Sequence, residues 1–278
     1  MTVAELVRVG AAAMPVRPGL PDPLSEARFL VANALAVTAA SLWAHPDDTV
    51  SAELITVVLE WCARRGRGEP AHYITAKCPF FGREFAVTPA VLIPRPETEL
   101  LIARALKLTL PTCPRVLDVG TGSGCIAVTL ALELATPVVV ATEESIVALA
   151  VARGNARRLG APVAFAAGDL AGFLTGGFDL VAANLPYVPA AARAELIPEV
   201  RDWEPAGALF AGADGLDLIR RFVGQLPSLL RPGGVALLEV GDGQAAAVEA
   251  LLAAGGLAID AAVEDCAGIA RIVVAQRR

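Results

Sequence analysis

Four consecutive residues, Asn184 to Tyr187, have the types and the spacing needed to position a weakly nucleophilic nitrogen. They read N-L-P-Y and follow a short apolar run that ends at Ala183. The nitrogen of a planar amide or aryl amine is a poor nucleophile because its lone pair is delocalised. An enzyme that transfers a methyl group to such a nitrogen must hold the nitrogen in line with the methyl carbon. The Asn184 oxygen and a nearby backbone carbonyl can accept both N–H hydrogens, and Tyr187 can stack on the planar group. The motif indicates transfer to nitrogen, with an Asx turn before proline as the alternative interpretation.

A glycine-rich turn, Gly120 to Gly124, could hold a nucleoside. It reads G-T-G-S-G and lies between a predicted strand and a predicted helix. Glycine has no Cβ, so a ligand can approach the backbone closely at the first turn of an open parallel sheet. The spacing differs from the G-x-G-x-x-G pattern of dinucleotide sites, which favours a nucleoside without a pyrophosphate. A tight turn without a ligand is the alternative, and Asp118 could orient the turn through backbone N–H groups.

Acidic residues follow the next two predicted strands. Glu143 comes directly after one strand and about 20 residues beyond the glycines, where a carboxylate can bind both ribose hydroxyls. The adjacent Glu144 is equally explained as a helix N-terminal carboxylate. After the following strand, Asp169 could accept from an adenine amino group and Leu170 could supply a backbone N–H, although both residues also suit a turn.

Alternating strands and helices must position these turns. The predicted strands are Arg115 to Val119, Val138 to Thr142, Val163 to Ala167, Asp179 to Ala183, Val235 to Val240, Leu257 to Val263 and Ala270 to Ala275. Helical patterns between most of them are typical of a parallel sheet covered on both faces. Only Asp265 to Gly268 separates the last two strands, so we expect an antiparallel hairpin at one edge.

Residues before this sheet follow other patterns. Helical periodicity predicts about three N-terminal helices, with starts at Ser25 and Ser51. Aromatic and β-branched residues from Pro79 to Ile93 predict a β-hairpin. We therefore expect a helical domain at 1–78, a hairpin connector at 79–96, and a doubly wound, mostly parallel α/β domain at 97–278.

Composition excludes several classes of protein. The chain has 278 residues, 55% of them hydrophobic, which is enough for one large and one small folded domain and excludes disorder. The net charge of -6 argues against general nucleic-acid binding. Five cysteines without a C-x-x-C pair and the absence of an export signal favour the cytoplasm. His45 and His72 are isolated, so we expect no metal site.

Two further motifs make the pattern specific. These are V-L-I-P-R-P-E-T-E-L-L at Val91 to Leu101 and R-D-W-E-P at Arg201 to Pro205. With the G-T-G-S-G and N-L-P-Y motifs, they closely resemble the HemK/PrmC family of protein-(glutamine-N5) methyltransferases, over about Glu69 to the C-terminus and more loosely before it. The segment I-P-R-P-E-T-E is the specific signature, because the other two motifs occur throughout Class I methyltransferases. The resemblance implies a Class I, Rossmann-like fold. It also implies methyl transfer from S-adenosyl-L-methionine to the glutamine of the Gly-Gly-Gln motif in class 1 peptide chain release factors, with S-adenosyl-L-homocysteine as the product.

The resemblance also implies which residues form the site. The cofactor would be held by Gly120, Thr121, Gly122, Ser123, Gly124, Glu143, Asp169, Leu170 and Asn184. The catalytic and glutamine-binding residues would be Asn184, Leu185, Pro186 and Tyr187. A segment closing over the site would add the substrate contacts Arg95, Glu97 and Thr98. The helical domain would dock the release factor, and we expect a monomer that binds neither a membrane nor, stably, nucleic acid.

Two of the predicted site residues depart from the family pattern. Leu185 replaces the first proline of N-P-P-Y, which keeps the backbone carbonyl but frees the φ angle, and Glu143 replaces the usual aspartate. N-L-P-Y is also typical of ribosomal RNA adenine dimethyltransferases, so adenine N6 methylation remains an alternative. A second alternative is a noncatalytic S-adenosylmethionine-binding module in which Leu185 marks decayed catalysis.

Overall fold

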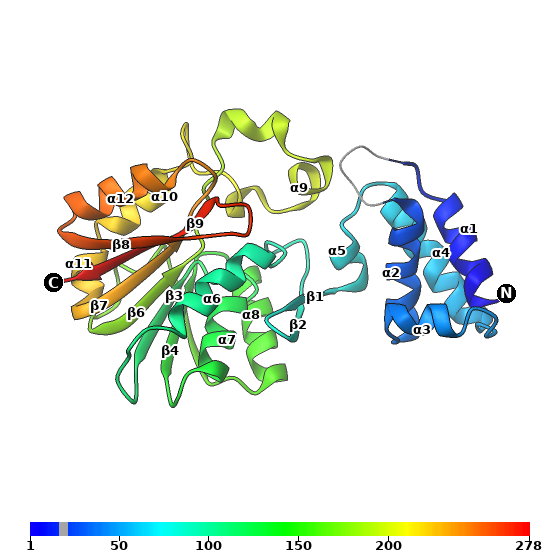
Figure 1. Cartoon of the computed structure of the whole chain (residues 1–278), viewed down its shortest axis with the longest axis horizontal. Helices are drawn as coiled ribbons and strands as arrows, with labels where there is room; N and C mark the ends of the chain where they lie inside the picture. The colour runs from blue at the N-terminus through cyan, green and yellow to red at the C-terminus, as the bar shows by residue number, and fades with distance from the viewer. Residues whose placement is uncertain (17–21) are drawn as a thin grey trace. The chain divides into compact units, whose positions relative to one another are not determined.

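A computed structural model describes residues 1–16 and 22–278, which form two compact units (Figure 1). The first unit contains Met1–Lys77 together with the later segment Leu196–Trp203. The second contains Cys78–Glu195 and Glu204–Arg278. The chain therefore leaves the second unit once, for a short excursion into the first. Within the described ranges, no helix has the length and apolar character needed to cross a membrane.

The first unit is built from helices. They are α1 (Val3–Ala12), α2 (Pro23–Leu35), α3 (Ala39–Ala44), α4 (Ala52–Gly66), α5 (Ala71–Thr75) and, from the later segment, α9 (Pro198–Trp203). Periodicity predicted about three helices before residue 78, and the short α3 and α5 were not foreseen. Arg65 on α4 is buried and forms ion pairs with Glu26 of α2 and Glu199 of α9. These pairs fasten the later segment to the helices.

The helix starts show why one of the two predicted boundaries was wrong. Ser51 caps α4 as expected, because its hydroxyl accepts from the Leu54 N–H. The helix α2 begins before Ser25, since Asp22 caps it and Pro23 occupies the first helical position. Ser25 instead donates its hydroxyl to the Asp22 carboxylate at 2.6 Å.

A seven-stranded sheet forms the centre of the second unit. Its strands are β3 (Arg115–Val119), β4 (Val138–Glu143), β5 (Val163–Ala167), β6 (Phe178–Ala183), β7 (Leu230–Glu239), β8 (Leu257–Glu264) and β9 (Ala270–Arg277). Their order is β5-β4-β3-β6-β7-β9-β8. The first five are parallel, and β9 is antiparallel to both β7 and β8. All seven predicted strands and the antiparallel edge are confirmed.

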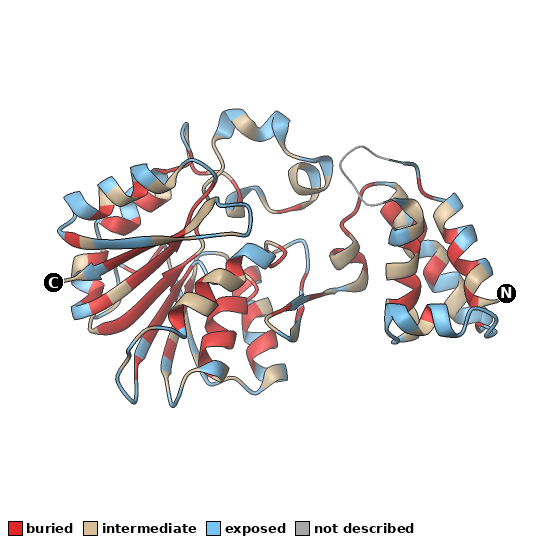
Figure 2. Cartoon of the chain, viewed as in Figure 1, coloured by how far each residue is buried: buried red, intermediate tan, exposed pale blue. Residues whose placement is uncertain are grey.

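Alternate side chains of the strands pack on opposite faces of this sheet, as the pleat requires. Leu180 and Ala182 of β6 belong to the core under α6 (Glu99–Ala105), α7 (Cys125–Glu133) and α8 (Ile146–Leu159). Val181 and Ala183 belong to the core under α10 (Asp217–Val223), α11 (Leu226–Leu229) and α12 (Ala245–Ala254). All of β6 is buried, and Figure 2 shows the central strands buried between half-exposed helices. The continuous apolar runs in the sequence reflect this covering of both faces.

A β-hairpin precedes the sheet. Its strands are β1 (Lys77–Phe80) and β2 (Arg83–Ala86), so the hairpin ends earlier than the predicted segment, which continues past Ala86 and contains Pro89. Proline has no N–H to donate to a partner strand, so pairing ends before Pro89. The hairpin is attached to α8, because the Asn155 side chain bonds both the N–H and the carbonyl of Ala86. The chain then runs to the short helix η1 (Pro96–Thr98) and α6; two more short helices, η2 (Ala190–Glu195) and η3 (Ala206–Ala208), follow β6.

Candidate active site

A cavity of about 570 Å³ lies in the second unit where four parallel strands end. The turns after β3, β4, β5 and β6 all contribute to its wall. In the sheet, β4 and β5 lie on one side of β3, and β6 and β7 lie on the other. Open α/β sheets bind their ligands at such a topological switch point, beyond the carboxyl ends of the strands. The four turns singled out in the sequence therefore meet at one cavity.

The buried side chain of Asp118, a residue of β3, anchors the glycine turn that follows this strand. One oxygen of this carboxyl group accepts from the Thr121 hydroxyl at 2.6 Å and from the Ala127 N–H at 3.1 Å. Burial raises the pKa of Asp118 to about 7, and these two hydrogen bonds act in the opposite direction. The backbone N–H groups of Gly120 and Thr121 both donate to the Thr142 carbonyl of β4 at 3.0 Å. Contacts within the protein therefore hold the backbone of this turn.

The three glycines of this turn have positive φ angles, but they serve different purposes. At Gly124, an added Cβ would lie 3.1 Å from the Ala152 Cβ, so this glycine permits close packing of α7 on α8. At Gly120, an added Cβ would lie 3.0 Å from the Leu185 side chain. At Gly122, an added Cβ would meet no atom within 4 Å, and this residue lines the cavity. Gly122 thus leaves an open place at the cavity wall.

The carboxylate of Glu143 connects this turn to the start of α8. Its Oε2 accepts from the Gly122 N–H and its Oε1 from the Ser145 N–H, both at 2.9 Å. Glu143 lines the cavity, so its oxygens stand at the wall where ribose hydroxyls could compete for them. Farther along the same wall are Asp169, which is paired with Arg221, and Leu170, whose φ is 53°.

The N-L-P-Y residues occupy the wall beyond β6. Asn184 lines the cavity, and its Nδ2 donates to the Thr98 hydroxyl at 3.1 Å. Leu185 is 4% exposed and packs against Gly120. The Tyr187 hydroxyl is 3.5 Å from Glu239 Oε1, and burial raises the pKa of this phenol to about 12. Tyr187 therefore remains neutral at ordinary pH.

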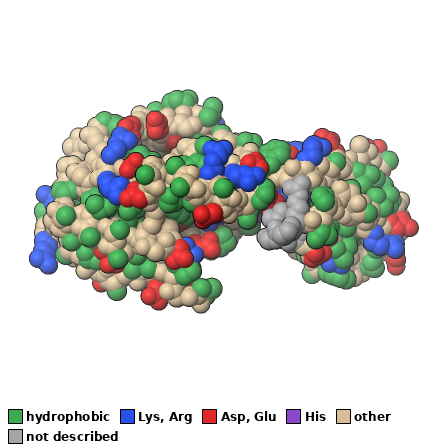
Figure 3. All heavy atoms as spheres, turned by 90° about the horizontal axis from the view of Figure 1, so that it is seen from above, with side chains coloured by type: hydrophobic (Ala, Val, Ile, Leu, Met, Phe, Trp, Pro, Cys, Tyr) green, Lys and Arg blue, Asp and Glu red, His purple; other side chains and the backbone are tan. Residues whose placement is uncertain are grey.

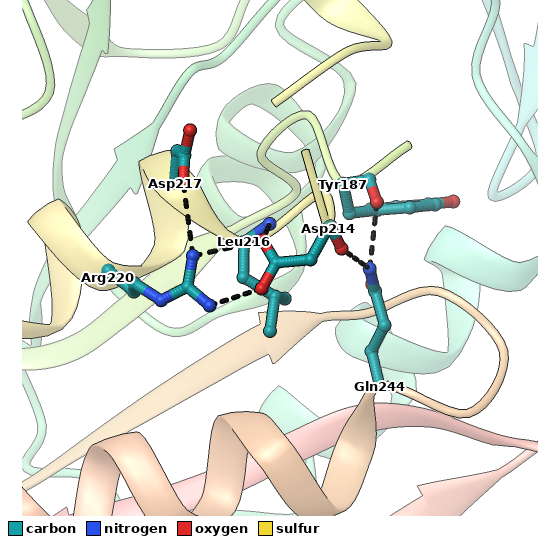
Figure 4. A network of polar contacts seen from close by, with 6 residues as sticks. All are labelled: Tyr187, Asp214, Leu216, Asp217, Arg220 and Gln244. Atoms are coloured by element: carbon teal, nitrogen blue, oxygen red, sulfur yellow. Dashed lines mark hydrogen bonds and ion pairs between the residues drawn. The ribbon is translucent and has the colours of Figure 1, made fainter. Parts of the chain in front are cut away.

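A polar network fixes the backbone of Tyr187 (Figure 4). The Gln244 amide donates to the Tyr187 carbonyl at 2.9 Å and to the Asp214 carbonyl at 3.3 Å. Asp214 itself accepts from the Leu216 N–H at 3.1 Å and pairs with Arg220, a residue of α10. The motif after β6 is thereby tied to α10 and to the start of α12.

The segment before α6 is tied down beside the cavity by an ion pair. Arg95 bonds the carboxylate of Glu204, which also accepts from the Ile93 N–H at 3.4 Å. Glu204 is 6% exposed; burial raises its pKa, and the neighbouring Arg95 guanidinium lowers it. Arg95 and Thr98 both line the cavity. The I-P-R-P-E-T-E and R-D-W-E-P motifs thus meet through one arginine and one glutamate.

Most of the site residues predicted from sequence lie together on the cavity wall. They are Arg95, Thr98, Gly120, Thr121, Gly122, Ser123, Glu143, Asp169, Leu170, Asn184, Leu185 and Pro186. Gly124, Tyr187 and the exposed Glu97 are not on the wall. Sequence reasoning assigned no site role to Gly168, Gly207, Ala208 and Leu218, which do line it. It also gave no role to Glu239, although an acidic residue ending an apolar strand was a usable signal.

Comparisons with known proteins agree on one family. Residues 16–75 match the model described as the PrmC N-terminal domain, and residues 97–199 match the methyltransferase small domain. The release factor glutamine methyltransferase of Geobacter sulfurreducens is 40% identical over 256 residues, covering 92% of this chain and 90% of that protein. The protein of the same name from Bordetella pertussis is 45% identical over 258 residues, covering 92% and 94%.

Solved structures share the fold at low identity. The hMettl16 catalytic domain in complex with the MAT2A 3'UTR hairpin 6 aligns with a TM-score of 0.57 and 17% identity, covering 82% of each chain. A methyltransferase from Pyrococcus furiosus aligns with a TM-score of 0.54 and 18% identity, covering 71% of this chain and 90% of that one. These likenesses confirm the Class I methyltransferase architecture of the second unit.

Proposed function

Because the chain belongs to the family of release factor glutamine methyltransferases, we propose that it methylates the glutamine of the Gly-Gly-Gln motif in class 1 peptide chain release factors. The methyl group comes from S-adenosyl-L-methionine and is received by the side-chain nitrogen N5, leaving S-adenosyl-L-homocysteine. The observation that carries this proposal is the identity of 40% or more to such enzymes over nine-tenths of the chain. The cavity bordered by Asn184 agrees with it.

The cavity residues fit S-adenosyl-L-methionine. The open place at Gly122 leaves room beside the glycine turn, and the volume of about 570 Å³ suits a nucleoside with an amino-acid arm. We propose that Gly120 to Ser123 hold the methionine portion, Glu143 the ribose, and Asp169 with Leu170 the adenine. When bound, the cofactor supplies a methyl group on a positively charged sulfur. Gly124 would act indirectly, by allowing the turn to pack on α8.

We propose that Asn184 orients the substrate glutamine. Its Oδ1 and the backbone carbonyl of Leu185 would accept the two N–H hydrogens and thereby aim the nitrogen at the methyl carbon. Pro186 would border the glutamine side chain, and Tyr187 would shape the pocket from beyond the cavity wall. Arg95 would hold the closing segment through Glu204, and Thr98 would act through Asn184. A protonated methylated amide can release its proton to solvent, so no general base is assigned.

We also propose that the helical unit docks the release factor and that the enzyme is a cytoplasmic monomer. All five cysteines are unpaired, which fits a reducing compartment. Among the residues drawn in colour in Figure 3, basic and acidic side chains are interspersed on the visible face. Such mixing suits a protein partner better than stable nucleic-acid binding, which needs clustered Lys and Arg.

The proposal can be tested by transfer of a labelled methyl group to purified release factor. We expect incorporation into the intact factor and none into a factor whose Gly-Gly-Gln glutamine is changed to alanine. Incorporation into adenine of RNA or DNA, and not into the factor, would favour the adenine alternative. Cofactor binding without transfer to any of these acceptors would favour the noncatalytic alternative.

A further inference from the structure

A buried carboxyl group with no assigned role, Glu239, lies beside Asn184. Glu239 ends β7, and Ala183, the last residue of β6, is paired with Leu238, so Asn184 directly follows β6 at the level of Glu239 on the adjacent parallel strand. Glu239 is 2% exposed, and its Oε1 is 3.5 Å from the Tyr187 hydroxyl. Within the described ranges, its buried Oε2 has no hydrogen-bond partner. Burying a carboxyl group without a full set of hydrogen bonds costs free energy, so its presence here calls for a functional explanation.

The surroundings of Glu239 bear on the orientation of the Asn184 amide. Burial raises the pKa of Glu239 to about 7, whereas the nearby Thr98 hydroxyl and Asn184 amide lower it, as donor groups that face a carboxylate do. The amide edge that stabilises a carboxylate must be the donor Nδ2, because a carboxylate only accepts. The same Nδ2 donates to the Thr98 oxygen, which leaves the Thr98 hydrogen free for the carboxylate. Both neighbours therefore favour the same orientation of Asn184.

This orientation determines what the cavity presents to a substrate. With Nδ2 facing Thr98 and Glu239, the planar amide directs Oδ1 the other way, and no described residue donates a hydrogen bond to Oδ1. If the amide were flipped, two N–H groups would face the two N–H groups of a substrate amide. That arrangement would repel the substrate instead of binding it.

We infer that Glu239 is a positioning residue that, with Thr98, fixes the Asn184 amide so that its oxygen accepts from the substrate nitrogen. This inference rests on the proposed function, since it concerns the acceptor site for the glutamine amide. It adds a residue on β7 to a site whose other proposed residues lie in the segment before α6 and at the carboxyl ends of β3 to β6. Glu239 touches neither reacting atom, so its effect is exerted entirely through Asn184.

The inference can be tested by exchanging the carboxylate at position 239 and the amide at position 184. Glu239→Gln keeps the shape but offers an N–H to Asn184, so the Asn184 amide can flip; we expect kcat to fall about tenfold or more while the cofactor Kd changes less than about twofold. Asn184→Asp alone places two carboxylates together and should reduce kcat further. In the double variant, the carboxylate at 184 can accept from the amide at 239 and still present oxygen to the substrate. We expect its kcat to exceed that of Asn184→Asp by about tenfold.

The controls separate orientation from folding and from the proposed function. Glu264→Gln changes an exposed glutamate at the end of β8 and should leave both kcat and the melting temperature unchanged. The side-chain amide protons of Asn184, identified by NMR from their loss in Asn184→Asp, should exchange slowly with solvent in the wild type and quickly in Glu239→Gln.

Each outcome decides the question. Rescue in the double variant and faster exchange in Glu239→Gln would support the inference. The inference would be overturned if the kcat of the double variant were no higher than the two single reductions in kcat, multiplied together, predict. It would also be overturned if the Asn184 amide protons exchanged at the same rate in Glu239→Gln as in the wild type. A wild-type enzyme that does not methylate release factor would refute the proposed function itself, while the exchange measurement would still report on the orientation.

Discussion

Replacing Gly122 by alanine should weaken cofactor binding while lowering stability no more than a matched glycine substitution away from the cavity does. Gly122 has a φ of 54°, lines the cavity, and would place a new Cβ where no protein atom lies within 4 Å. Its N–H bond to Glu143 would survive the substitution. Gly160 provides a matched control, because it also has a positive φ of 71° and open space at its Cβ position, but it ends α8 away from the cavity.

The magnitudes follow from the two backbone conformations. A left-handed non-glycine residue costs about 1–2 kcal/mol, so both variants should lose that much stability. For a domain of this size the loss corresponds to a melting temperature lower by about 2–8 °C. Only the Gly122 variant places a methyl group beside the bound cofactor. A displacement costing about 1.4 kcal/mol would raise the cofactor Kd about tenfold.

Calorimetric titration of S-adenosyl-L-methionine into both variants, with parallel thermal unfolding, measures both quantities. We expect similar melting temperatures but a raised Kd in Gly122→Ala alone. Equal cofactor affinities in the two variants would refute the assignment of Gly122 to the binding surface. A large loss of stability confined to Gly122→Ala would show that the space at this position is filled by protein.

Three other substitutions test separate parts of the site. Asn184→Ala should lower turnover about 100-fold or more while sparing cofactor affinity, and unchanged turnover in a labelled-methyl assay would exclude its orienting role. Leu185→Pro should retain activity because the carbonyl remains, but the loss of a well-packed side chain should lower the melting temperature; loss of activity would show that the backbone here needs a different φ. Asp118→Asn should flatten the dependence of stability on pH. The folded pKa of about 7 is raised above 3.8, so the stabilisation is complete below pH 3.8 and disappears as the pH rises through 7. Urea unfolding across this range should show a decline in the wild type that is smaller in the variant, and identical slopes would contradict this.

The strands of the central sheet were predictable because they are buried on both faces. Such strands appear in the sequence as short, nearly continuous apolar runs, and residues 115–119 and 163–167 were predicted with the observed boundaries. The chemistry at their carboxyl ends was predictable for the same reason, since parallel strands bring their following turns to one edge. Both the strands and the placement of the turns could therefore be predicted from residues close together in the sequence.

Features that depend on contacts between distant segments were not predictable. The pairing of Arg95 with Glu204 joins residues far apart in sequence, and nothing near either residue indicates the other. The role inferred for Glu239 depends on the strand order, which places β7 beside β6. The start of α2 was missed for a local reason: Asp22 and Ser25 are both good caps, and Pro23 favours the earlier one.

The most direct test of the account is to locate the transferred methyl group by tandem mass spectrometry. Release factor should be incubated with S-adenosyl-L-methionine and either the wild-type enzyme or Asn184→Ala, and the peptide that contains Gly-Gly-Gln should then be fragmented. We expect one methyl group on the glutamine side-chain amide with the wild-type enzyme and almost none with the variant. A methyl group on any other residue, or equal methylation by the two enzymes, would contradict it.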